Sequence, residues 1–115
     1  MTATQEDVVL EQGATFNHYW EIQNKDLTSG YTFLAKVRTQ HAGTVVFTLS
    51  SGDASLTVAK VGSHSHVTAN MIPASTAALA APAMHVYDLE YTQTSTGIVT
   101  RAVEGSMFIT PEATR

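Results

Sequence analysis

Large apolar and polar side chains alternate along most of this chain with a period of two residues. In "FNHYWEI", which spans residues 16–22, Phe16, Trp20 and Ile22 share one face with His18, and Tyr19 lies on the other face with polar neighbours. Successive side chains of a β-strand point to opposite faces of its sheet, so this period indicates strands with one buried face. We expect Trp20 in the core and His18 partly buried beside it.

The alternation recurs in eight short segments spaced 8–12 residues apart. They are "ATFNHYWEIQ", "YTFLAKVRT", "TVVFTLS", "SLTVAKV", "GSHSHVTANM", "MHVYDLEYT", "GIVTRAVEG" and "SMFIT". This spacing predicts an all-β fold, a sandwich or a barrel of antiparallel strands. Of the two we expect an antiparallel Greek-key (immunoglobulin-like) β-sandwich of about seven to eight strands, as the crossover and the resemblance described below imply. The 115 residues suffice for one core, so residues 1–115 are expected to form a single domain. The turn "SGD" at 51–53 predicts a hairpin between the strands that flank it.

The stretch "MIPASTAALAAPAMHVYDLEY" combines an alanine-rich piece with the clearest strand. Residues Ala74 to Leu79 favour a helix, but they are too few for a stable isolated one. We therefore predict one short helical crossover near 74–80, bounded by Pro73 and Pro82, whose Ala and Leu side chains cap the core. Tyr87 follows directly and is predicted to be a structural corner, with its hydroxyl bonded back to the corner backbone.

Charge and composition exclude several classes of function. The net charge is −4, and the six basic residues are scattered, which argues against a nucleic-acid surface. No apolar run approaches the ~20 residues of a membrane span, and the first residues lack a signal-peptide pattern. Without cysteine there is no disulfide or thiolate metal site. These features predict a protein that is made and assembled in a cytosol, with no membrane partner.

The histidine pair in "HSH" is the strongest candidate for metal binding. His64 and His66 lie two apart on a predicted strand, so both imidazoles project from one face and could supply two ligands to Zn, Ni or Fe. The neighbouring Ser65 and Thr68 suggest exposure, and a structural or solvent-exposed role for the pair is the alternative. We therefore expect no metal and no cofactor.

Three other residues are candidates for contacts rather than catalysis. Asp88 and Glu90 share the outer face of one strand and could accept a partner's Lys or Arg, although such pairs are often only solvated. Tyr19 could anchor an interface or simply lie on the surface. No strained nucleophile turn and no paired acid and base occur, so no catalytic residue is assigned and an enzyme is not expected.

Four segments, taken in order, carry a resemblance to a known family. They are "LEQGATFNHYWEIQ", "DLTSGYTFLAKVRT", "STAALAAPAMHVYDLEY" and "GIVTRAVEGSMFITPEATR". The series resembles small immunoglobulin-like virion structural proteins of tailed bacteriophages, which are encoded among tail, baseplate and head genes. The similarity extends from Leu10 to Arg115.

The resemblance implies a non-enzymatic virion protein, assembled in the host cytoplasm and present in many copies. Its expected partners are other virion proteins and further copies of itself, in the tail, baseplate or fibre-attachment region. A capsid decoration protein is one alternative, and a module that binds host-surface glycans through its loops is another. The polar ends, at about 1–7 and 111–115, are expected to be arms that order on neighbouring subunits, with Arg115 as an interface candidate. Deleting the residues before Val8 is then expected to leave a folded domain.

Overall fold

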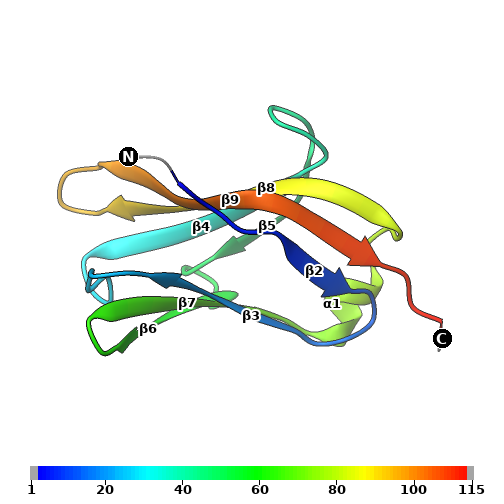
Figure 1. Ribbon diagram of the computed structural model, residues 1–115, viewed down its shortest axis with the longest axis horizontal. Helices are drawn as coiled ribbons and strands as arrows, with labels where there is room; N and C mark the ends of the chain where they lie inside the picture. Colours follow the sequence, from blue (N-terminus) through cyan, green and yellow to red (C-terminus); the bar gives the residue numbers. More distant parts are fainter. Residues whose placement is uncertain (1–2, 114–115) are drawn as a thin grey trace.

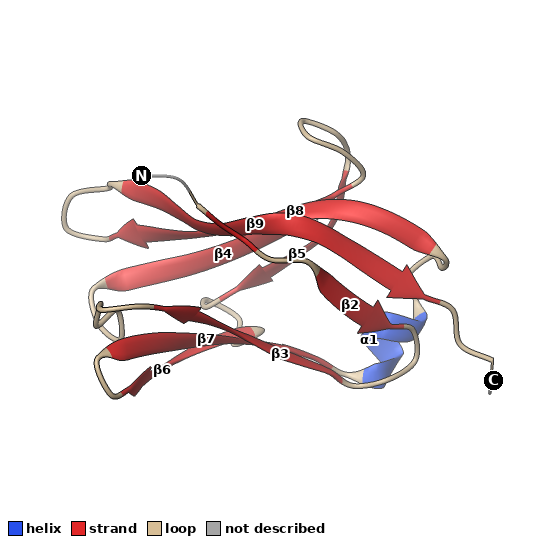
Figure 2. Ribbon diagram, in the orientation of Figure 1, coloured by secondary structure: helices blue, strands red, loops and turns tan. Residues whose placement is uncertain are grey.

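A computed structural model describes residues 3–113 of the chain as an immunoglobulin-like β-sandwich (Figure 1). Two sheets pack face to face, and one short helix lies at the end of the sandwich where the chain leaves the smaller sheet (Figure 2). The predicted all-β sandwich class is confirmed.

The larger sheet contains six strands in the order β1-β9-β8-β4-β5, with β2 also paired to β9. Its strands are β1 (Thr4–Gln5), β2 (Val8–Glu11), β4 (Tyr31–Arg38), β5 (Val45–Ser50), β8 (Ala83–Gln93) and β9 (Val99–Thr110). The smaller sheet has the order β3-β7-β6, formed by β3 (Phe16–Ile22), β7 (His64–Met71) and β6 (Leu56–Val61). The chain crosses between the sheets after β2, β3, β5 and β7, as a Greek key requires.

The N-terminal segment departs from the prediction. The polar arm expected over residues 1–7 contains a strand, because Thr4 and Gln5 pair with β9. Both β1 and β2 run parallel to β9, so the larger sheet is mixed rather than purely antiparallel. At the other end, residues 111–113 form no helix or strand, although the backbone N–H of Glu112 bonds to the side chain of Gln12.

The last two predicted strands are one continuous strand, β9. The strand continues through Gly105. This glycine lies at the point where the N-terminal segment comes close to β9. A Cβ atom added at Gly105 would lie 2.1 Å from the carbonyl oxygen of Glu6. Glycine therefore lets the backbone between β1 and β2 approach β9.

The predicted hairpin at 51–53 is wrong, because β5 and β6 belong to different sheets. Residues 51–55 instead carry the chain from one sheet to the other. The hairpin that does form joins β6 to β7 through Gly62 and Ser63, with Gly62 at φ +63°. Turn-forming residues occur both at 51–53 and at 62–63. Whether the flanking strands pair with each other depends on which face each strand buries.

The predicted helical crossover is present as α1 (Pro73–Ala77), which connects β7 in one sheet to β8 in the other. The expected capping of the core is only partly present, because Leu79, just after the helix, packs against the core. The alanines are exposed, and the buried side chain is that of Thr76. The Thr76 hydroxyl donates to the carbonyl of Ala14 at 2.7 Å and accepts from the N–H of Gly13 at 3.1 Å. A polar contact therefore ties the crossover to the loop between β2 and β3.

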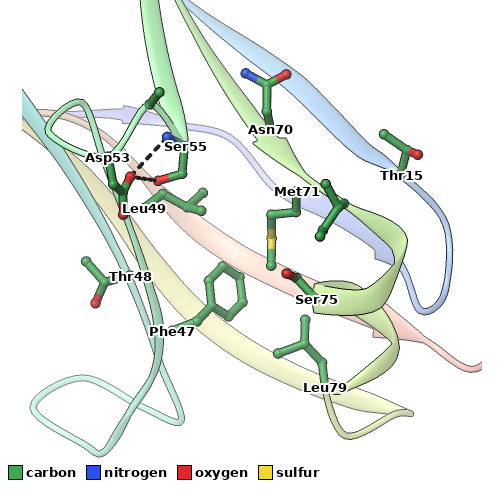
Figure 3. A pocket seen from close by; sticks show the side chains of 12 residues that line it. Thr15, Phe47, Thr48, Leu49, Asp53, Ser55, Asn70, Met71, Ser75 and Leu79 are labelled. Carbon is green, nitrogen blue, oxygen red and sulfur yellow. Dashed lines mark hydrogen bonds between the residues drawn. The ribbon is translucent and has the colours of Figure 1, made fainter.

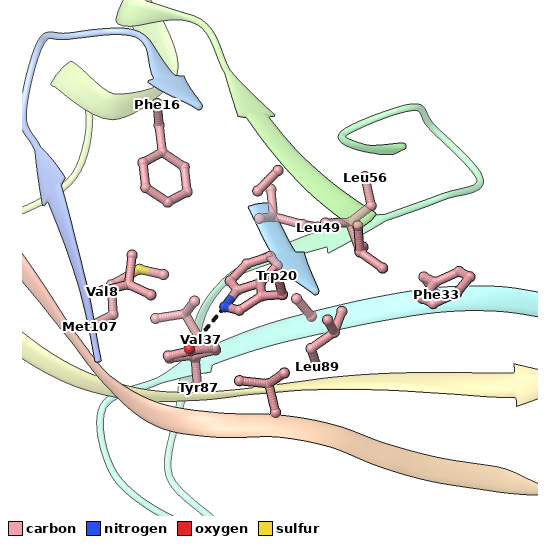
Figure 4. Close-up of a cluster of buried hydrophobic side chains, with 14 of the residues drawn as sticks. Val8, Phe16, Trp20, Phe33, Val37, Leu49, Leu56, Tyr87, Leu89 and Met107 are labelled. Carbon is pink, nitrogen blue, oxygen red and sulfur yellow. Dashed lines mark hydrogen bonds between the residues drawn. The ribbon is translucent and has the colours of Figure 1, made fainter. Parts of the chain in front are cut away.

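The core lies between the sheets and contains the bulky residues of the alternating pattern (Figure 4). Trp20 from β3 is 1% exposed and meets Tyr87 from β8, with ring centroids 5.7 Å apart. Val8 and Leu10 from β2 are equally buried, so this N-terminal strand completes the core. The predictions of a core Trp20 and a partly buried His18 are confirmed.

Candidate functional site

A buried polar network joins the N-terminal segment to both sheets. The hydroxyl of Tyr87 donates to the carbonyl of Glu6 at 2.5 Å and accepts from the indole N–H of Trp20 at 3.1 Å. The carboxylate of Glu6 lies 2.7 Å from Nε2 of His18, whose ring meets the edge of Trp20. Burial raises the pKa of Tyr87 above its ordinary value, so its proton stays on the hydroxyl. The two neutral donors, the indole N–H of Trp20 and the hydroxyl of Tyr87, both have acceptors within the chain. The network is therefore structural.

Tyr87 therefore bonds to a backbone carbonyl, but not to the corner that precedes it in the chain. Its acceptor, Glu6, is 81 positions away in sequence. Nothing near Tyr87 in the sequence pointed to this partner. The sequence places Glu6 in a predicted polar arm, and only the parallel pairing of β1 with β9 brings it to the network.

The outer face of the smaller sheet carries an ordered row of polar and aromatic side chains. Tyr19 is 56% exposed and stacks on His66, with ring centroids 4.6 Å apart and an interplanar angle of 14°. His66 Nε2 lies 3.0 Å from a carboxylate oxygen of Glu21, its register partner on β3. This hydrogen bond, and the nearby His64, lower the pKa of Glu21. Next along the row, Asn17 donates to Asn70 at 3.1 Å.

The two histidines do project from one face, but their nitrogens have other partners. Nδ1 of His64 accepts from the backbone N–H of Asn24 at 3.0 Å, and His66 contacts Glu21. Within residues 3–113 no group of three or more His, Cys, Asp or Glu side chains is arranged to hold a metal ion. Plain exposure is not what the structure shows, because His64 and His66 are half-buried and Ser65 between them is fully buried. These contacts favour a structural role for His64 and His66.

Asp88 and Glu90 lie on the outer face of the larger sheet, on β8. Asp88 is 3.6 Å from the guanidinium of Arg101, which also lies 3.9 Å from Glu104. Glu90 is in register with Leu34 on one side and Arg101 on the other. Asp88 therefore already has a cation from its own chain, which weakens its case as a receptor for a partner's Lys or Arg. Arg115 lies outside the described residues.

An open groove of about 740 Å³ lies between β5 and the helical end of the smaller sheet (Figure 3). Phe47, Leu49, Met71 and Leu79 form much of its lining. Among the described residues that line this groove, Asp53 alone has a titratable side chain. Hydrogen bonds from the side chain and the N–H of Ser55 lower the pKa of Asp53, so it serves as a charged cap for its loop. The groove thus has apolar walls but no acid and base that converge.

A row of exposed apolar side chains crosses three strands on the outer face of the larger sheet. Val9, Phe108 and Met84 are in register on β2, β9 and β8, and are 59%, 38% and 65% exposed. Pro82 and Pro111 lie beside them. We call these five residues the apolar row. Sequence reasoning missed this surface, because only the register brings the three strands' residues together.

No protein-family model and no curated protein sequence matches this chain. Among the described residues, no helix has both the length and the apolar character needed to span a bilayer.

Proposed function

We propose that this chain is a non-enzymatic structural protein of a tailed-phage virion. It is a β-sandwich module present in many copies, which makes subunit contacts in the tail, baseplate or fibre-attachment region. The proposal starts from the resemblance of the four sequence segments and is supported by the kind of surface that the fold presents.

The apolar row is the observation that carries the proposal. Isolated exposed apolar residues are normal on a soluble protein, but a contiguous set is typical of a surface that meets another protein. Three large side chains abreast on a rigid sheet, flanked by two prolines, would lose little conformational entropy on contact. This suits a part that is held permanently by its neighbours.

The state of the polar side chains agrees with a structural role. The titratable groups considered above, Glu6, His18, Asp53, His66 and Asp88, are each engaged by a partner within the chain. Such contacts hold these side chains in place and stabilise the fold, which suits a structural part.

The test is the location of the protein in particles. Particles released by cells that carry the gene would be purified on a density gradient, analysed by mass spectrometry and labelled with a gold-conjugated antibody. We expect the protein to sediment with the particles and the label to lie at the tail or baseplate. Label on the capsid would replace the tail assignment with capsid decoration. Protein that is made but stays out of the particle fraction would contradict a virion role.

A further inference from the structure

The free edges of the two sheets differ in how well they are protected against pairing with another chain. An edge strand exposes unpaired N–H and C=O groups, and proteins commonly protect it with bulges, lysines, short length or capping side chains. In β5, the pairing with β4 is irregular at Val37/Arg38. The backbone N–H of Ser50 bonds to the hydroxyl of Ser55, which also lies 3.2 Å from the Ser50 carbonyl oxygen.

Two other edges carry protection of their own. On β6, Lys60 is exposed and lies 3.7 Å from Asp26. At the opposite edge of the larger sheet, β1 has only two residues, and β2 is flanked by Asp7 and ends in Glu11.

The remaining edge, β3, has no bulge and no lysine, and its one acidic residue, Glu21, is already paired with His66. All seven of its residues pair with β7 without a register shift, and it contains no lysine, arginine or proline. It is the longest regular edge strand among the described residues. Its outer face carries the exposed Tyr19 at the centre.

The hydrogen-bond pattern identifies which groups of β3 face outward. The N–H of Asn70 bonds to the carbonyl of Ser55, so the backbone groups of Asn70, Thr68 and His66 point toward β6. Because these directions alternate along an antiparallel strand, β7 meets β3 through Val67 and Ala69, opposite Trp20 and His18. In β3 itself, Asn17, Tyr19 and Glu21 therefore point their N–H and C=O groups away from the sheet.

We propose that two copies of this protein associate through β3, antiparallel about a two-fold axis at Tyr19, to form one continuous six-stranded sheet. In this register Tyr19 faces Tyr19 of the second copy, and Asn17 faces Glu21 of the second copy on either side. About six backbone hydrogen bonds close the seam. Such a dimer would be one of the subunit contacts of the proposed virion role, but it is inferred from the β3 edge and not from that role.

The side chains suit this self-pairing. Asn17 and Glu21 are equally distant from Tyr19, so the two-fold axis sets an amide donor against a carboxylate and keeps the two Glu21 side chains apart. Asn17 uses one amide hydrogen on Asn70, which leaves its second amide hydrogen as a donor for the second copy. Glu21 accepts from His66 and Gln23, and the remaining lone pairs of its carboxylate can accept from the second copy. Tyr19 is already held by its stack on His66, so little freedom is lost when it becomes buried.

The N-terminal segment passes near one end of this edge, where Thr4 and Glu6 line a hollow together with Glu21 and Ile22. Glu6 contacts the side chains of His18 and Tyr87, so the bend between β1 and β2 lies over the inner face of β3. In Figure 1, β3 runs along the near side of the smaller sheet, below β2.

The first test is the mass of the protein in solution. Sedimentation equilibrium of the full chain over a wide concentration range is expected to show a monomer–dimer equilibrium. Tyr19→Lys should weaken it at least about tenfold, because it sets two lysines opposite each other at the axis. Thr57→Lys is the matched control, since it adds the same charge on the outer face of β6 in the same sheet. A protein that stays monomeric at the highest concentration, or a dimer unchanged by Tyr19→Lys, would overturn the proposal.

The second test examines the register. Asn17→Glu should weaken the dimer by opposing Glu21 of the second copy, and Asn17→Glu combined with Glu21→Gln should restore it. Hydrogen exchange of the Asn17, Tyr19 and Glu21 amides should slow as concentration rises, and should stay fast in Tyr19→Lys. A dimer in which these three amides exchange freely would refute pairing through β3. A monomer would refute this inference and leave the virion role standing, because that role is tested by location in particles.

Discussion

The indole N–H of Trp20 donates a 3.1 Å hydrogen bond to the hydroxyl of Tyr87, so a polar contact crosses from one sheet to the other inside the core. That hydroxyl in turn donates to the backbone of Glu6. One phenol thus holds together the smaller sheet, the larger sheet and the N-terminal segment.

Tyr87→Phe removes this link without changing the packed volume of the ring. It leaves the buried Trp20 N–H and the Glu6 carbonyl without their partner, so the free energy of unfolding should fall by about 1–3 kcal/mol. Urea denaturation followed by tryptophan fluorescence measures it. Tyr91→Phe, on the same strand and 7% exposed, is the control and should cost less than about 1 kcal/mol. Equal midpoints for Tyr87→Phe and the wild type would show that the hydroxyl network is dispensable.

Tyr87 should also make the domain sensitive to alkali. Burial raises its pKa in the folded state above the ordinary value of 10.0, whereas the unfolded chain ionises at that ordinary value. The folded state then binds more protons above pH 10, so stability is complete below pH 10 and falls as pH rises, by up to about 1.4 kcal/mol per pH unit. Denaturation midpoints measured across this range should fall more steeply for the wild type than for Tyr87→Phe. If the midpoints of the wild type and of Tyr87→Phe fall equally with pH, the loss of stability in alkali comes from other groups.

Deletion of residues 1–7 tests whether the N-terminal segment belongs to the domain. The deletion removes β1, the Glu6 carbonyl that Tyr87 uses, and the carboxylate beside His18. We expect a loss of about 2–4 kcal/mol in the free energy of unfolding, from several hydrogen bonds of about 1 kcal/mol each. Glu6→Ala retains the backbone contacts and should lose less. A truncated protein as stable as the full chain would restore the original prediction of a dispensable arm.

Gly105→Ala tests the close approach of the N-terminal segment to β9. The new methyl group would meet the Glu6 carbonyl oxygen at 2.1 Å, and this neighbour is backbone, so the segment between β1 and β2 must move. We expect a loss of about 2 kcal/mol or more and faster hydrogen exchange at Glu6, whose N–H bonds to Glu104. Gly52→Ala is the control, because its nearest neighbour would be the Ser50 hydroxyl at 3.4 Å. Unchanged exchange at Glu6 would contradict the contact.

Thr76→Val tests the polar tie between the helical crossover and the loop after β2. The substitution keeps the shape of the side chain but removes the bonds to Ala14 and Gly13, at an expected cost of about 1–3 kcal/mol. Thr76→Ser keeps the hydroxyl, so it should retain most of the stability that Thr76→Val loses. Ser75→Ala, at an exposed neighbouring position, should stay within about 0.5 kcal/mol of the wild type. The measurement is the thermal unfolding midpoint, and a loss in Thr76→Ser equal to that in Thr76→Val would point to packing rather than hydrogen bonding.

The elements best predicted from sequence are those whose signal is local. The strand around Trp20, the partly buried His18 and the short crossover after Pro73 all follow from periodicity and from the residues that begin and end helices. For the candidate sites, the sequence indicated correctly that His64 and His66 share one face. It could not show that each has a hydrogen-bond partner on another segment.

The elements that were missed depend on contacts between distant segments. Val8, Val9 and Leu10 are all apolar, so β2 carries no apolar–polar alternation in its sequence, and only its pairing with β9 places Val8 and Leu10 in the core and Val9 on the surface. Gly105 is a second example. In the sequence a glycine suggests the end of a strand, whereas in the fold it is the point where the backbone of Glu6 approaches β9. The hairpin predicted at 51–53 failed because a turn does not specify which sheet receives the next strand.

The amino-acid sequence by itself determined that this chain forms strands with one apolar face, because the two-residue period places the bulky side chains on one side of each strand, where a sandwich or a barrel can bury them. Only the tertiary structure decided which strand lies beside which, and therefore that Glu6 meets Tyr87, that Val9, Phe108 and Met84 form one row, and that β3 is left as an open edge. The physical reason is that side-chain alternation is a property of neighbouring residues, whereas register and sheet order come from the packing of segments far apart in the chain.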